Sequence, residues 1–167
     1  MKKTIMLCIL FFSLSQGYSQ KLVMQKESYV NLTESVYLTC LRLHFELHSS
    51  DSSLNEYFES DTLYLEPFFL AIDEIESTIG RVCVYVNLPK LLRMHQNQQF
   101  PIYAVEILPI LLREDHLTIK INDVLYRQSN RFKEGFSGTL VGYSEVNVSF
   151  DCTHNRFRID GVKYYYY

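Results

Sequence analysis

The sequence has few of the residues that mark fibrous or linker-dominated chains. Its 167 residues include six glycines and four prolines, which excludes a collagen-like protein or a glycine-rich and proline-rich linker. No repeating period marks a solenoid protein. Hydrophobic residues make up 47% of the chain and aromatic residues 14%, well above the content of disordered chains. At this length and composition we expect one globular domain.

The motifs of several familiar enzyme classes are also absent. The chain has no Walker loop, no dinucleotide-binding fingerprint and no EF-hand loop. A stretch beginning at Gly135 looks like the start of the G-x-S-x-G nucleophile motif, but Thr139 stands where its last glycine belongs. The cysteines lack CxxC spacing, which argues against a zinc ribbon or a dithiol redox site. The sequence therefore predicts no cofactor and favours a non-catalytic protein.

The N-terminus has the pattern of a cleaved secretory signal. Lys2 and Lys3 form a basic region, residues 5–14 are almost entirely apolar, and small residues follow where a signal peptidase cleaves. A transmembrane helix would need about 20 apolar residues, and no later run is that long. We predict that residues 1–19 are removed and that residues 20–167 form a single secreted or periplasmic domain.

Three cysteines remain after this cleavage, namely Cys40, Cys83 and Cys152. In an oxidising compartment two of them are expected to form a disulfide. We prefer the pair Cys83 and Cys152, because both fall near the predicted C-terminal sheet. The other two pairings stay open.

The hydrophobic pattern predicts an α+β fold, a β-rich domain with a mainly antiparallel sheet and one or two short helices. Helices are expected over residues 67–79, ending at Gly80, and over residues 89–96. A two-residue hairpin is expected at Asn122-Asp123. Strands are expected over residues 81–87, 100–108, 117–121, 124–127, 139–151 with a break or bulge at Gly142, 156–160 and 162–167.

Residues 41–48 fit two structures. Apolar and polar residues alternate strictly here, which favours a half-buried strand. Asn31 and Glu34, however, have the spacing of a capping box that would open a helix through the same residues. We expect the strand and keep the helix as the alternative.

The same segment holds the one group of residues with metal-ligand spacing: His44, Glu46 and His48. In a strand these three side chains share a face, and in a helix the two histidines still do. Two imidazoles and a carboxylate are donors that a zinc or non-haem iron site uses. The alternative is the wetted face of an amphipathic strand, in which the histidines stand about 13 Å apart.

Acidic residues are concentrated in one part of the chain. Between Leu43 and Gly80 there are nine acidic residues and no Lys or Arg. Such a segment attracts a basic protein partner, and we expect Glu56, Glu59 and Asp61 to contact it. The alternative is a solvated acidic face that the other half of the same domain balances.

Two further patterns in the sequence are typical of other kinds of protein. Basic and aromatic residues mix between Arg127 and Phe136, as in single-strand nucleic-acid platforms, but export and a negative net charge argue against nucleic acid. The tyrosines from Tyr164 to Tyr167 are typical of the last strand of a small outer-membrane β-barrel. A closing strand that packs its tyrosines on one face explains them equally well.

Together these patterns predict a small exported non-catalytic binding or interaction domain, such as an inhibitor, an immunity protein or an adhesin-like module. One alternative is an envelope enzyme with a metal site that involves His44 and His48. The small outer-membrane β-barrel is the other.

Overall fold

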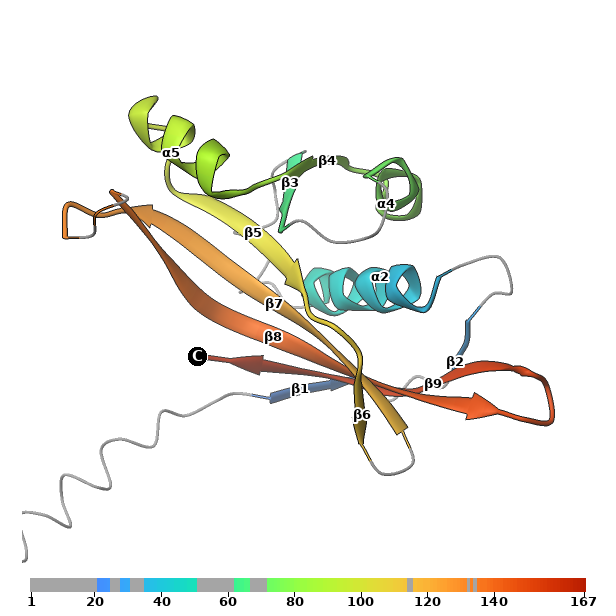
Figure 1. Ribbon diagram of the computed structural model, residues 1–167. Coiled ribbons are helices and arrows are strands. Elements are labelled where there is room, and N and C mark those ends of the chain that lie inside the picture. The colour runs from blue at the N-terminus through green and yellow to red at the C-terminus, as the bar shows by residue number, and fades with distance from the viewer. Residues whose placement is uncertain are drawn as a thin grey trace, which may run out of the picture.

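One mixed sheet forms the framework of the protein (Figure 1). The computed structural model describes residues 21–24, 28–30, 35–50, 62–66, 72–113, 116–131, 133 and 135–167. The strands in these residues are β1 (Lys21–Met24), β2 (Ser28–Tyr29), β3 (Thr62–Leu65), β4 (Val82–Tyr85), β5 (Ile102–Ile107), β6 (Leu111–Arg113), β7 (His116–Gln128), β8 (Phe136–Asp151) and β9 (Arg156–Tyr166). The described helices are α2 (Val36–Ser49), α4 (Ile72–Ile79) and α5 (Leu88–Gln96).

Seven of these strands follow one another across an open sheet in the order β1-β9-β8-β7-β5-β3-β4. Strand β2 pairs with β9, and β6 pairs with β7. Only β3 runs parallel to its neighbours, β4 and β5, and the other pairs are antiparallel. The predicted α+β class with a mainly antiparallel sheet is therefore confirmed. Within the described part of the chain, no helix is both long and apolar enough to cross a membrane.

The hairpin predicted at Asn122-Asp123 is wrong. Strand β7 runs straight through both residues and pairs with β5 on one side and β8 on the other. Ile119 and Ile121 begin a period-2 pattern of buried residues that Asp123 and Leu125 continue. Two flanking strands satisfy the backbone here, so a weak local turn signal is overridden by sheet pairing.

The irregularity predicted at Gly142 is confirmed as a bulge in β8. Asp123 lies opposite Gly142, whereas the next residue of β7, Val124, lies opposite Leu140. One residue of β8, Val141, is therefore extra at this point. A bulge of this kind re-aims the side chains around it, and Asp123 is one of them.

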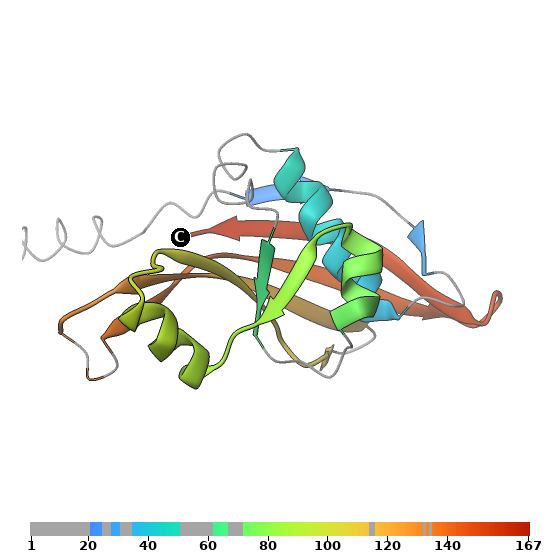
Figure 2. The same ribbon diagram turned by 90° about the horizontal axis from the view of Figure 1, so that it is seen from above.

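Residues 41–48 are helical, so the predicted strand is wrong and the helical alternative holds. Helix α2 begins after Ser35, whose Oγ accepts a hydrogen bond from the Tyr37 amide at 3.3 Å. The proposed cap residue Asn31 lies outside the described residues. Leu43 and Leu47 are both about 1% exposed, because α2 packs on the sheet and also contacts α4 (Figure 2). A helix buried over such a wide arc mimics the alternation of a strand.

The two shorter helices agree with their predicted positions. Helix α4 ends at Gly80, which has a positive φ of 68° and donates its amide to the Glu76 carbonyl at 2.8 Å, as a C-terminal glycine does. Pro67, the predicted start of this helix, lies outside the described residues. Helix α5 begins after Asn87, whose side chain accepts a hydrogen bond from the Lys90 amide at 3.0 Å.

The sheet has a hydrophobic core on each face. Val105 and Ile107 of β5 belong to the main core beneath α2 and α4, whereas Ile102 and Ala104 belong to a smaller core beneath α5. Since side chains alternate along a strand, α5 covers the opposite face from α2. The long strands β7, β8 and β9 therefore present one face to α2, and the candidate site lies in this layer.

The expected disulfide is not formed, and Cys40, Cys83 and Cys152 are thiols in the structure. Cys83 lies on the edge strand β4, whereas Cys152 follows β8, four strands away in the sheet. Four strand spacings amount to about 19 Å, and a disulfide needs Cα atoms within about 7 Å. The preferred pair is thus incompatible with the strand order, which the sequence does not reveal.

Candidate metal centre

Helix α2 directs two histidines into the interface with the sheet. His44 and His48 lie four residues apart, which places them on the same side of the helix, and their ring centroids are 4.1 Å apart. Their side chains are 0% and 1% exposed. Two imidazoles so deeply buried need polar partners, because an unsatisfied buried polar group costs stability.

Asp123 in the middle of β7 supplies that partner. Its Oδ1 lies 3.0 Å from His44 Nε2, and its Oδ2 lies 3.1 Å from His48 Nε2. The carboxylate is 0% exposed. One buried acid therefore bridges both histidines, with one oxygen for each ring.

Ser144 and Tyr164 complete the polar cluster from β8 and β9. Ser144 Oγ lies 2.7 Å from His44 Nδ1, and the Tyr164 hydroxyl donates to Asp123 Oδ2 at 2.5 Å. Both residues are fully buried, and they lie directly opposite each other in the β8–β9 ladder. Three neighbouring strands thus converge on two side chains of one helix.

Gly142 makes the room that Tyr164 needs. A Cβ at this glycine would lie 2.3 Å from the Tyr164 hydroxyl and 2.7 Å from its Cζ. Any other residue would displace the ring that reaches Asp123. The bulge and the glycine together therefore shape the space around the carboxylate.

The electrostatics keep Asp123 ionised. Burial alone would raise the pKa of this carboxyl group, but the charge and hydrogen bond of His44, together with those of His48, outweigh it and hold the pKa well below its ordinary range. A permanent negative charge is therefore present inside the main core. It faces two nitrogen atoms that bind either a proton or a metal ion.

The three side chains match the donor set of a transition-metal site. One ligand atom from each of His44, His48 and Asp123 lies within 4.8 Å of the others. In a tetrahedral zinc site with bonds of about 2.0–2.1 Å, neighbouring ligand atoms stand about 3.3 Å apart. The observed separations of 3.0 Å to Oδ1 and 3.1 Å to Oδ2 are a few tenths of an ångström shorter than this spacing, and all three ligand atoms lie within 4.8 Å of one another.

The predicted ligand Glu46 is not part of this cluster. Because residues two apart on a helix differ by roughly 200°, the helical form of α2 turns Glu46 away from the sheet. Its carboxylate instead accepts a hydrogen bond from Arg42 at 3.2 Å. The structure brings His44 and His48 together through the helix and adds Asp123, which the sequence did not single out as a ligand.

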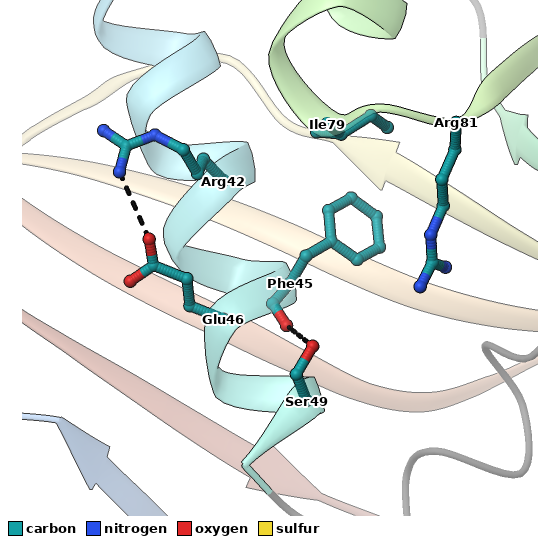
Figure 3. A pocket seen from close by; sticks show the side chains of 6 residues that line it. All are labelled: Arg42, Phe45, Glu46, Ser49, Ile79 and Arg81. Atoms are coloured by element: carbon teal, nitrogen blue, oxygen red, sulfur yellow. Dashed lines mark hydrogen bonds and ion pairs between the residues drawn. The ribbon is translucent and has the colours of Figure 1, made fainter.

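A separate cavity of about 340 Å³ lies on the outer side of α2 (Figure 3). Phe45 points toward Ile79 across it, and Arg81 stands on its far side (Figure 3). The lining residues are Arg42, Phe45, Glu46, Ser49, Ile79 and Arg81. None belongs to the histidine cluster, so a molecule bound in this cavity would be separated from His44 by the body of the helix.

Ser144, His44 and Asp123 also form a hydrogen-bonded row of the residue types found in serine hydrolases. The Ser144 side chain is fully buried beneath α2. A substrate carbonyl group would have to displace the helix to reach its hydroxyl oxygen. The geometry therefore argues against nucleophilic catalysis at Ser144.

The other predicted segments stay untested. Glu56, Glu59 and Asp61, the expected contacts for a basic partner, lie outside the described residues, and so do residues 1–19, the predicted signal sequence. Comparison of the chain with protein-family models, with curated proteins and with solved structures finds no match.

Proposed function

We propose that this protein is a small exported, non-catalytic binding domain whose ligand is a transition-metal ion. The ion is coordinated by three atoms: His44 Nε2, His48 Nε2 and one oxygen of Asp123. The observation that carries this proposal is the convergence of the three donor atoms within 4.8 Å at a fully buried position. Imidazole and carboxylate together suit zinc and its neighbours in the first transition series.

The hydrogen bond between His44 and Ser144 supports metal binding. A ligating histidine nearly always donates its second ring N–H to an oxygen atom, which fixes the tautomer. Ser144 Oγ is 2.7 Å from Nδ1, so the Nδ1–H tautomer leaves the Nε2 lone pair directed at Asp123. In that tautomer the lone pairs of Nε2 and Asp123 Oδ1 face each other at 3.0 Å, an arrangement that needs a cation between them, supplied either by a metal ion or by a proton on Nε2.

Complete burial supports a binding role without catalysis. A catalytic metal keeps a coordination position open to substrate, whereas a structural metal is enclosed by protein ligands. His44, His48 and Asp123 lie between α2 and three strands, and none is more than 1% exposed. An ion held here ties the helix to the sheet and stabilises the folded chain.

Isothermal titration of chelator-treated protein with Zn²⁺ tests the proposal. The wild type is expected to bind one ion per chain. His48→Gln keeps an N–H group that can donate to Asp123 but lacks an imidazole ligand, so it should fold and lose most of its affinity. The matched control is His154→Gln, because His154 forms a histidine–aspartate pair with Asp151 at 2.8 Å on the surface.

Three outcomes would contradict the proposal: no binding by the wild type, unchanged binding by His48→Gln, or equal losses in both variants. Circular dichroism spectra and thermal melts of each variant show that the comparison is made between folded proteins.

Export is a separate part of the proposal and depends on the basic and apolar pattern of residues 1–19. Intact-mass measurement of protein recovered from the secreting host should show these residues missing. Full-length protein in the cytosol would contradict export and leave the metal site unaffected.

A further inference from the structure

We propose that Tyr164 is a fourth ligand of the metal ion and that the resulting donor set selects Fe³⁺ over Zn²⁺. This inference rests on the proposed function, because it names the ion that the same site takes. It adds a phenolate oxygen to the two imidazoles and the carboxylate.

The position of the Tyr164 hydroxyl supports this assignment. It lies 2.5 Å from Asp123 Oδ2, and His48 Nε2 lies 3.1 Å from the same oxygen. The tyrosine ring meets the His48 ring edge-on, with centroids 4.8 Å apart. The hydroxyl and His48 Nε2 therefore both contact the same oxygen of Asp123, so the hydroxyl lies on the side of the carboxylate that faces His48.

The backbone of β8 leaves space for the Tyr164 hydroxyl. Gly142 leaves open the space in which a Cβ would lie 2.3 Å from the Tyr164 oxygen. The extra residue of the β8 bulge, Val141, falls beside this glycine. This space lets the Tyr164 hydroxyl reach Asp123, beside the proposed ligand atoms.

The donor set distinguishes between the two ions. A phenolate and a carboxylate are hard, anionic oxygen donors, which favour a small ion of high charge, whereas imidazole binds Zn²⁺ and iron alike. On binding, the O–H bond of Tyr164 breaks, its proton passes to solvent, and the phenolate oxygen donates an electron pair to the iron. No electron is transferred, because the ion enters as Fe³⁺ and remains Fe³⁺.

Visible absorption spectroscopy with ferric nitrilotriacetate tests the inference. Coordination of a phenolate to Fe³⁺ produces a charge-transfer band in the visible region, which a hydrogen-bonded tyrosine outside the coordination sphere does not produce. The wild type should develop this band with one Fe³⁺ per chain. Tyr164→Phe keeps the ring and should lose the band, with a fall in Fe³⁺ affinity of at least roughly tenfold relative to Zn²⁺.

Tyr165→Phe is the matched control. Tyr165 is the next residue of β9, so its side chain points to the opposite face of the sheet, where its ring stacks on Tyr143 at 4.8 Å. This variant should keep the band. Near-ultraviolet circular dichroism should show that both variants are folded.

The outcomes separate this inference from the proposed function. A colourless Fe³⁺ complex of the wild type, or a band that persists in Tyr164→Phe, would overturn the role of Tyr164. If Zn²⁺ still binds in that case, the metal site itself stands. If neither Zn²⁺ nor Fe³⁺ binds the wild type, both the inference and the proposed function are wrong.

Discussion

Replacing Asp123 by asparagine should strongly destabilise the metal-free protein. The change keeps the volume of the side chain and removes its charge. The carboxylate faces three donors or potential donors: His44 Nε2, His48 Nε2 and the Tyr164 hydroxyl. An amide oxygen accepts about two hydrogen bonds, and the amide NH₂ group donates. At least one buried donor would therefore face another donor.

The size of the effect follows from burial. Breaking a buried charged pair by removing one partner costs about 3–5 kcal/mol, and a whole domain has a free energy of unfolding of about 5–15 kcal/mol. With a urea dependence of about 2 kcal/mol per molar, the midpoint of unfolding should fall by roughly 2 M. The variant should remain folded in water, but with a much smaller free energy of unfolding.

The effect should also depend on pH. The pKa of Asp123 is lower in the folded protein than its value of about 3.9 in the unfolded chain. The stabilisation by Asp123 is therefore fully present above about pH 4 and is lost as the pH falls through the lowered pKa of the folded state. The difference between wild type and variant should shrink as the pH falls below about 4.

Urea unfolding followed by far-ultraviolet circular dichroism, with a chelator present, measures this difference. Asp73→Asn is the control, because Asp73 is exposed in the first turn of α4 and its replacement should change the midpoint little. The reasoning is refuted if Asp123→Asn unfolds within about 0.5 kcal/mol of the wild type, the range of ordinary surface substitutions.

Two further predictions concern Gly142 and the cysteines. Gly142→Ala should lower the free energy of unfolding by about 1–3 kcal/mol, because the new methyl group would meet the Tyr164 hydroxyl at 2.3 Å; an unchanged urea midpoint would show that the ring does not need this space. Exposed Cys152 should react with N-ethylmaleimide at pH 8 in the native state. Cys83 should react only on unfolding, because burial, followed by the charge of Glu76, raises its pKa to about 11; equal rates at the two cysteines would contradict the described burial.

The sequence predicts those parts of the fold whose signals are local. Helix α5 spans Leu88–Gln96 against the expected residues 89–96, Gly80 ends α4 as expected, and Gly142 lies at the expected irregularity in β8. For residues 41–48 the strand was preferred to the helix, because residues buried against the sheet and α4 cover a wide arc of α2. A wide buried arc places Leu41, Leu43 and Leu47 at strand-like intervals, and only the tertiary contacts resolve the ambiguity.

The sequence points to the two histidines of the candidate site but not to its aspartate. The spacing of His44 and His48 places two candidate ligands on one face of either secondary structure, but Glu46 shares that face only in the strand, which does not form. Asp123 was assigned to a turn, because aspartate after asparagine is a local turn signal. The signal that could have found it is the alternation of Ile119, Ile121, Asp123 and Leu125, in which a carboxylate occupies a core position. Its nearness to α2 comes from long-range packing, which no local pattern encodes.

Anomalous diffraction from crystals grown with Zn²⁺ tests the metal site most directly. A difference map collected above the zinc absorption edge should show one strong peak at bonding distance, about 2.0–2.2 Å, from His44 Nε2, His48 Nε2 and an oxygen of Asp123. A map without a peak at this position, in which the carboxylate still contacts both imidazoles directly, would contradict the account and leave the cluster a purely structural link between α2 and the sheet.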